Sequence, residues 1–197
     1  MSYFTPAKFP QEQQDSVVRE AYIELRLRRL VAMAAARQCG PVVQGLGTLD
    51  AEDKNLPFTS GGFGNFIKGV RFQYWVGVAE FACIDEKSAR KRWEILAKAS
   101  PEIASTDYAY SYMALARLDP ADGKIKARTA LAFLQRQLAA ATPEYQGPLL
   151  YNQGLLQMIA GRKDEAAASF RAGAAAATSG MVEYLNLDAI RMLDAGQ

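Results

Sequence analysis

The sequence predicts an all-α protein: a solenoid of antiparallel helix hairpins with a long N-terminal helix and a C-terminal capping helix. Three observations support this prediction. Alanine, the best helix former, is enriched, above all after residue 100. Apolar residues recur at three- and four-residue steps, as on one face of a helix. The candidate helices after residue 66 are joined by short loops, which makes neighbouring helices antiparallel.

The composition narrows the classes of function. The 197 residues suit one domain or one short solenoid, and the net charge of +2 does not indicate a polyanionic partner. There is no histidine, which excludes Ser-His-Asp and Cys-His catalysis and histidine-ligated zinc or haem. The two cysteines cannot form a four-cysteine metal site within one chain. We therefore expect a protein that is not an enzyme and carries no cofactor or metal.

The first predicted region is an N-terminal arm and a long helix, residues 1–40. Residues 1–9 are expected to be extended, and the periodicity predicts a helix from about Gln11 to Arg37. The run Cys39-Gly40-Pro41 is typical of a helix end, with a glycine followed by a proline that cannot continue the helix.

The termini and cysteines bear on the compartment. The N-terminus lacks a basic segment followed by an apolar one, so it does not indicate a secretory signal. Cys39 and Cys83 could pair, which sequence cannot show, but two reduced structural thiols are the preferred interpretation. We therefore expect an intracellular, reducing compartment, either the cytoplasm or an organelle interior.

A glycine-rich loop is predicted over residues 41–65, with one short turn at about Leu49–Lys54. Long structureless loops inside compact domains are uncommon and are usually functional or mobile. The alternative, equally weighted, is that the segment simply crosses from the first helix to the helices that follow.

Helix–turn–helix units are predicted over residues 66–197. The candidate helices are Phe66–Ile84, Glu86–Ala99, Thr106–Leu118, Lys124–Ala141, Pro143–Ala160, Lys163–Ala177 and Gly180–Leu193. The longest apolar run, Phe72 to Ile84, is too short to cross a membrane, since a spanning helix needs about 20 residues. We expect no transmembrane segment, which leaves peripheral membrane association open.

An internal repeat relates two of these units. When Gly154 is aligned with Gly77, Ala166 falls opposite Ala89 and Phe170 opposite Trp93. A small residue in each helix allows close packing, and the aromatic residue fills the groove to the next unit.

This pattern resembles the tetratricopeptide repeat over roughly residues 70–178. The match is clearest from Tyr151 to Phe170, with Gly161 in the turn between the helices; Pro101 lies where that family ends a repeat. The middle unit is degenerate, with Gly123 placed in its turn. The resemblance implies that Gly180–Leu193 caps the array.

The resemblance also implies a groove, lined by the first helix of each unit, that binds another polypeptide. Its expected partner-binding residues are Arg71, Tyr74, Val78, Phe81, Tyr151, Asn152, Leu155 and Met158. The basic residues that grip a peptide carboxylate in one subfamily are missing, which leaves an apolar and aromatic groove with Asn152 bonding a partner's backbone. The alternative is that the protein's own N-terminal helix or 41–65 loop fills the groove, since aromatic residues at helical spacing are usually core.

Two basic clusters have structural interpretations as well as functional ones. Lys87, Arg90, Lys91 and Arg92 are balanced by nearby acids and indicate a solvated helix face, so no nucleic-acid partner is expected. Arg26, Arg28 and Arg29 could meet an acidic partner or lipid headgroups, but Glu20 and Glu24 lie one turn away and favour internal ion pairs.

The sequence therefore predicts a protein–protein interaction scaffold or adaptor that binds another polypeptide, with subunits of a larger complex as its partners. The alternative is a permanent accessory subunit of a multi-subunit, membrane-associated complex. In that case the arm 1–9 and the loop 41–65 would contact its neighbours. Fold resemblance alone does not decide between the two.

Overall fold

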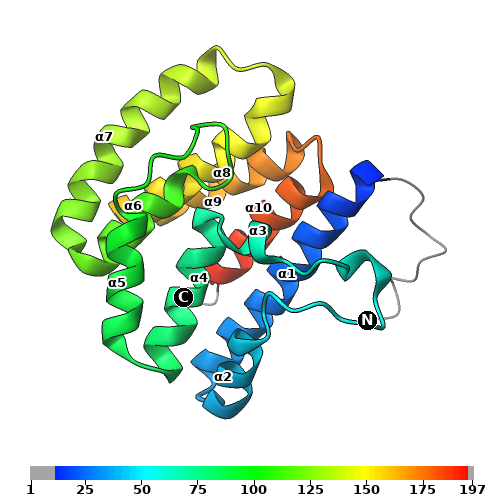
Figure 1. Ribbon diagram of the computed structural model, residues 1–197. Helices are drawn as coiled ribbons and strands as arrows, with labels where there is room; N and C mark the ends of the chain where they lie inside the picture. The colour runs from blue at the N-terminus through cyan, green and yellow to red at the C-terminus, as the bar shows by residue number, and fades with distance from the viewer. Residues whose placement is uncertain (1–11, 195–197) are drawn as a thin grey trace. The chain divides into compact units, whose positions relative to one another are not determined.

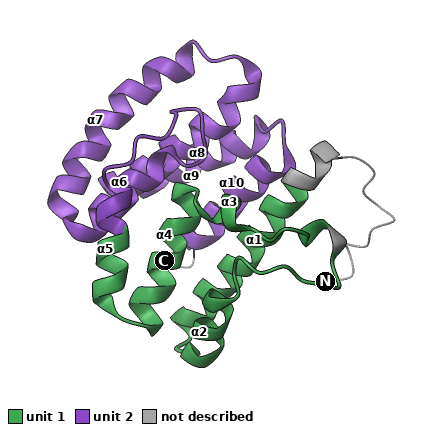
Figure 2. Cartoon of the chain, viewed as in Figure 1, with its two compact units in different colours: residues 1–92 green, residues 93–197 purple. Residues whose placement is uncertain are grey.

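The computed structural model describes residues 12–194, with side chains from residue 17 onward except at residue 57. Within that range the secondary structure is entirely helical, which confirms the all-α class. Contacts divide the chain into two compact units, residues 1–92 and 93–197 (Figure 2). The division falls inside one helix, α5 (Glu86–Leu96), and not at the glycine-rich segment where the sequence suggested a boundary.

The first unit begins with α1 (Glu12–Ala35), which ends two residues earlier than predicted. Arg37 takes a left-handed conformation, with φ of 59°, and its backbone N–H donates to the carbonyl of Ala34. The next N–H, of Gln38, donates to the carbonyl of Met33. These two bonds are the Schellman pattern that satisfies the last carbonyls of a helix, here formed around an arginine in place of the usual glycine.

A second helix, α2 (Cys39–Gly47), occupies the first part of the predicted 41–65 loop, and this corrects the loop prediction. Gly40 and Pro41 lie in its first turn. A proline is tolerated there because the first N–H groups of a helix have no partner within the helix. The same dipeptide therefore follows one helix and opens the next.

The segment after α2 is folded against α1 and is not structureless. It contains a short 3₁₀ turn, η2 (Pro57–Thr59), and one further helical turn, α3 (Gly64–Ile67). The Phe63 N–H donates to the carbonyl of Asp50 at 2.9 Å, and the Phe63 ring stacks on Tyr22 of α1 with 5.4 Å between ring centres. Gly62 has φ of 68°, and a side chain there would meet the Asp50 carbonyl. The turn therefore requires glycine on two counts.

The helix α4 (Val70–Cys83) packs against both α1 and α2. A small apolar core formed by Ala34, Val42 and Ala79 joins the three helices. Cys39, the first residue of α2, forms a disulfide with Cys83, the last residue of α4, over a Cα–Cα distance of 4.9 Å. This pairing corrects the expectation of two reduced thiols, because the fold brings together the ends of two helices that lie 44 residues apart in sequence.

The second unit consists of α6 (Tyr108–Leu118), α7 (Pro120–Ala139), α8 (Pro143–Ala160), α9 (Lys163–Ala175) and α10 (Gly180–Asp194) (Figure 1). The bounds of α8 coincide with the predicted ones, and those of α6, α9 and α10 lie within two residues of them. Helix α7 begins four residues earlier than predicted. Consecutive helices pack on one another, and α8 also contacts α6 and α10. Helices that follow one another in sequence are thus also neighbours in this unit, while the solenoid arrangement stays a prediction.

Several helices of the second unit make close contact at glycine residues. A side chain at Gly154 of α8 would collide with the ring of Phe170 on α9, and one at Gly173 of α9 would collide with Asn186 on α10. Gly123 fills the same role in α7, where a Cβ would stand 2.6 Å from the Cα of Ala116. Gly123 was predicted to lie in a turn. It is helical because Asp119 caps α7 four residues earlier and accepts the N–H groups of Ala121 and Asp122.

Of the helices described, none is long and apolar enough to cross a membrane.

Candidate functional site

The structure places Arg71 in a buried ion cluster and not on a groove surface. The side chain is 1 % exposed; its Nε donates to Glu24 at 3.1 Å and its Nη2 to Glu20 at 2.6 Å. Glu24, also 1 % exposed, accepts a second bond from Arg28 at 2.8 Å. The guanidinium of Arg28 in turn lies 4.0 Å from the ring centre of Trp75. The carboxylates of Glu20 and Glu24 on α1 therefore bond the Arg71 guanidinium, which was expected to contact a partner.

The other predicted residues of α4 differ in exposure. Tyr74 is buried, with its ring edge-on to Trp75, while Val78 is half-buried. Phe81 is the only one of the eight predicted residues that is exposed, at 48 %. Along this helix the predicted contact surface is thus reduced to its last turn.

In the second unit, Tyr151 and Asn152 bond to the protein itself. The hydroxyl groups of Tyr151 and Tyr110 lie 2.7 Å apart, and both side chains are buried. The Asn152 amide donates to the carbonyls of Ile103 and Ser105 at 3.1 and 2.8 Å. Its oxygen accepts the backbone N–H of Ala109 at 3.3 Å. Asn152 therefore bonds a polypeptide backbone, as predicted, but the backbone belongs to its own chain.

Leu155 is buried and Met158 half-buried, which completes the set. Five of the eight predicted residues are thus buried, and this corrects the expectation of an open groove. The self-filling alternative describes the packing better. Helix α1 supplies the filling side chains in the first unit. In the second unit they come from α6 and the segment before it, which the sequence did not suggest.

The three arginines of α1 do not share one role. Arg28 forms the predicted ion pair with Glu24. Arg26 instead donates to the backbone carbonyl of Thr48 at 3.2 Å and lies 5.6 Å from the ring centre of Tyr22. Arg29 is exposed and has no hydrogen bond or ion pair to another described residue. Two of the three guanidinium groups are therefore left without an acidic partner among the described residues.

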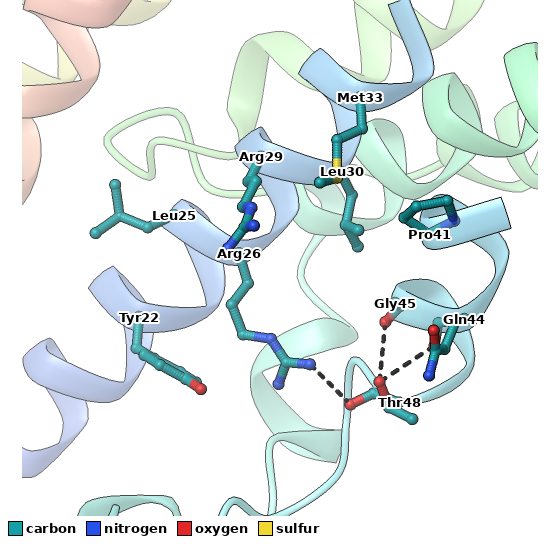
Figure 3. Close-up of a pocket in the computed structure, with 10 residues that line it drawn as sticks. All are labelled: Tyr22, Leu25, Arg26, Arg29, Leu30, Met33, Pro41, Gln44, Gly45 and Thr48. Atoms are coloured by element: carbon teal, nitrogen blue, oxygen red, sulfur yellow. Dashed lines mark hydrogen bonds between the residues drawn. The ribbon is translucent and has the colours of Figure 1, made fainter. Parts of the chain in front are cut away.

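These two arginines line a pocket between α1 and α2 with a volume of about 560 Å³ (Figure 3). Its apolar side is made of Tyr22, Leu25, Leu30, Met33 and Pro41. The volume lies within the range of about 300–1,000 Å³ typical of small-molecule sites, which are mostly apolar with a few placed polar groups.

The packing of α2 on α1 gives the pocket its floor. A side chain at Gly45 would collide with Leu30, so the two helices are in close contact at this point. The polar side consists of Arg26, Arg29, Gln44 and Thr48, and no acidic residue is among the described residues that line the pocket. The arrangement offers an apolar surface beside two positive charges, which suits a ligand that is apolar and anionic at once.

Sequence reasoning missed this pocket because it did not predict α2. One signal was available on α1. Leu25, Arg29 and Met33 follow one another at four-residue steps, which places a charge within an apolar stripe. That pattern, without an acid four residues before or after Arg29, could have marked the arginine as a binding residue.

No group of three or more histidine, cysteine, aspartate or glutamate residues in the described part of the chain could hold a metal ion. Burial and the neighbouring hydroxyl of Tyr112 raise the pKa of Tyr108 well above its usual value, so Tyr108 stays protonated. The expectations of no enzyme activity and no cofactor remain predictions.

Comparisons with models of protein families, with curated proteins and with solved structures gave no match to this chain.

Proposed function

We propose that this chain is a non-catalytic scaffold or adaptor, a solenoid similar to tetratricopeptide repeat proteins that binds another polypeptide within a larger assembly. The observation that carries the proposal is the repeated packing in the second unit. Three helix–helix contacts of this unit, α6–α7, α8–α9 and α9–α10, are each made at a glycine: Gly123, Gly154 and Gly173. Stacked helix pairs of this kind form the extended surfaces that repeat proteins use for binding.

The exposed face of α7 is the best-supported contact surface in that unit. Ile125 and Phe133 lie two turns apart on this face and are 61 % and 44 % exposed. Residues 124–137 contain four basic side chains and no acidic one. Arg136 lies over the Phe133 ring, 5.8 Å from its centre. Exposed apolar residues that are surrounded by basic side chains favour a partner segment that is both apolar and acidic.

The test is affinity capture of the tagged chain from its native source, with wild type beside the double variant Ile125→Glu and Phe133→Glu. Loss of co-purifying proteins from the variant, with an unchanged helical circular dichroism spectrum, is the expected result. Substituting Tyr74 or Tyr151 would be a poorer test, since both side chains are buried and their loss would disturb the core.

Leu187→Glu is the matched control. Leu187 is an exposed apolar residue on α10 of the same unit, so its substitution makes the same kind of apolar-to-Glu change at one position away from α7. This variant should retain every partner. Equal recovery by wild type and the α7 variant, or no co-purifying protein at stoichiometric amounts, would contradict the proposal.

The second candidate is a permanent accessory subunit, contacting its neighbours through residues 1–9 and 41–65. The arm lies outside the described residues. The 41–65 segment includes α2, and the part after it packs on α1, where Thr59 is buried and bonds the backbone of Asp53 and Leu56. We therefore expect this segment to resist protease in the isolated chain. Cleavage there in isolation, with protection only in an assembly, would favour the accessory subunit.

The compartment proposed here differs from the one expected from sequence. That expectation depended in part on two reduced thiols, and the Cys39–Cys83 disulfide removes that part of its support. Disulfides persist in oxidising environments and are rare in the cytosol, so the pairing favours an oxidising compartment. Thiol labelling of freshly isolated native protein tests this, with no reactive cysteine expected before reduction.

A further inference from the structure

We propose that the α1–α2 pocket binds a small amphipathic monoanion: a carboxylate attached to an aliphatic chain. This inference is independent of the proposed scaffold function, because it concerns a different unit of the chain and a small ligand. It is based on the volume of the pocket, on the residues of its walls and on the hydrogen-bond partners of Arg26 and Arg29.

The walls favour an aliphatic body. Leu30 and Met33 on α1 lie on the side of Pro41 on α2, and Leu25 lines the pocket further along α1 (Figure 3). Leu25 is 45 % exposed, far more than the core leucines of this helix. A flexible methionine beside branched leucines accommodates apolar groups of varied shape. Covering this surface with a hydrocarbon chain would remove apolar area from water, which is favourable in proportion to the area covered.

The charges favour a single carboxylate. Arg26 is already held by the Thr48 carbonyl and lies against the Tyr22 ring, so its guanidinium is oriented but partly occupied. Arg29, one turn further along α1, has no partner among the described residues and offers a whole guanidinium face. A guanidinium binds a carboxylate through two parallel N–H···O bonds. Among the described residues, Arg29 has no partner, Arg26 is partly occupied and the pocket lining contains no acid, and this arrangement matches one negative charge better than two.

The nearest acids of α1 are occupied elsewhere. Glu24 accepts bonds from Arg28 and Arg71 and is buried, and Glu20 bonds Arg71. They are therefore not available to neutralise Arg26 or Arg29. These four arginines thus have two different roles. Arg28 and Arg71 stabilise the α1–α4 contact, while Arg26 and Arg29 line the pocket.

The test is isothermal titration calorimetry of the full chain with decanoate, below its micelle concentration. Saturable binding of one decanoate per chain is expected. The neutral analogue 1-decanol should bind about tenfold more weakly, the loss expected when a charged hydrogen bond is removed. Decyltrimethylammonium should not compete with decanoate. Absence of saturable decanoate binding, or equal affinity for decanoate and decanol, would overturn the proposal.

Two pairs of variants locate the binding. Leu25→Glu places a carboxylate four residues before Arg29, where it would pair with that arginine and exclude the ligand. Leu25→Lys changes the same exposed position with the opposite charge. We expect at least a tenfold loss of decanoate affinity in the first variant. The loss in the second should be clearly smaller, because Leu25→Lys removes an apolar contact but adds no acid that competes for Arg29. Arg29→Gln should also weaken binding about tenfold, whereas Arg128→Gln, at an exposed arginine on α7, should leave it unchanged.

A bilayer surface is the competing source of apolar anions. Flotation with vesicles of phosphatidylcholine and phosphatidylglycerol separates the two. Vesicle binding that Leu25→Glu abolishes, without any decanoate binding in solution, would mean that these residues contact a membrane surface, and the single-ligand proposal would be wrong. Decanoate binding that both Leu25 variants leave unchanged would place the ligand elsewhere and would also contradict it.

Discussion

The two units of the chain are stabilised by different kinds of contact. The first unit depends on pairs of residues far apart in sequence: the Arg71–Glu24 ion pair, the Cys39–Cys83 disulfide and the Phe63–Asp50 backbone bond. The second also has such pairs, for example Asn152 with Ser105, but in addition three of its helix contacts are made at glycines, such as Gly154 against Phe170. Pairs of the first kind are specific but give little signal in a sequence, whereas a glycine at a fixed spacing from an aromatic residue can be recognised.

The largest expected effect comes from breaking the buried ion cluster of the first unit. Glu24→Ala removes one of the carboxylates that the described residues place on the buried Arg71 and leaves the half-exposed Glu20. Removing one partner of a buried pair destabilises a protein by about 3–5 kcal/mol, because the remaining charge is uncompensated. Urea unfolding measured by circular dichroism should show this loss in the free energy of unfolding.

The matched variant in the second unit is Glu165→Ala. Glu165 pairs with Arg162 at 3.4 Å, but the two side chains are 55 % and 45 % exposed. Exposed pairs contribute only about 0–1 kcal/mol, so this substitution should change stability little. If both substitutions lowered the free energy of unfolding equally, Arg71 would not be desolvated as described. The proposed difference between the two units would then be wrong.

An intermediate effect on stability is expected at the glycines where helices make close contact. In Gly154→Ala the added methyl group collides with the Phe170 ring, and overpacking of this kind costs about 1–3 kcal/mol. Gly47→Ala, at the end of α2, is the matched control, because a Cβ there meets nothing within 4 Å. Alanine is the better helix former, so Gly47→Ala should be neutral or stabilising by up to about 1 kcal/mol. Thermal unfolding of both variants measures the difference. A neutral Gly154→Ala would show that α8 and α9 are not in close contact.

The smallest effect concerns the start of α5. Asp85 accepts the backbone N–H of Ser88 at 2.7 Å, and this bond, with the Ser88 hydroxyl, lowers the pKa of Asp85 below its ordinary 3.8. A lowered folded-state pKa means that the carboxylate contributes stability above about pH 4 and loses it as pH falls through the folded value. Asp85→Asn should therefore reduce stability slightly at pH 7 and flatten its decline below pH 4. An unchanged slope of stability against pH would contradict this role.

The sequence predicted the helices whose ends carry local signals. The predicted and observed bounds of α8 coincide because Pro143 stands in its first turn and Gly161 takes the left-handed conformation, with φ of 82°, just after its last residue. Both features depend only on the residues at the helix ends. In contrast, α2 was missed because its first turn contains a glycine and a proline, which indicate a helix end as readily as a helix start.

The candidate site was harder to predict than the fold. Nothing local distinguishes Arg71 from an exposed arginine, because its two acidic partners lie 47 and 51 residues away. The same applies to Asn152, whose amide bonds carbonyls 47 and 49 residues earlier. Periodicity assigned both residues to a helix, but it could not show which segment covers them. The pocket required two helices, only one of which was predicted.

The disulfide also determines what a cut in the backbone would do. It joins residues 39 and 83 and so closes a loop that contains α2, η2, α3 and nearly all of α4. A single peptide bond broken anywhere inside this loop would leave both fragments covalently attached. The nicked protein would run as one species on a non-reducing gel and as two after reduction. The first unit can therefore tolerate a break in its glycine-rich segment without losing either piece.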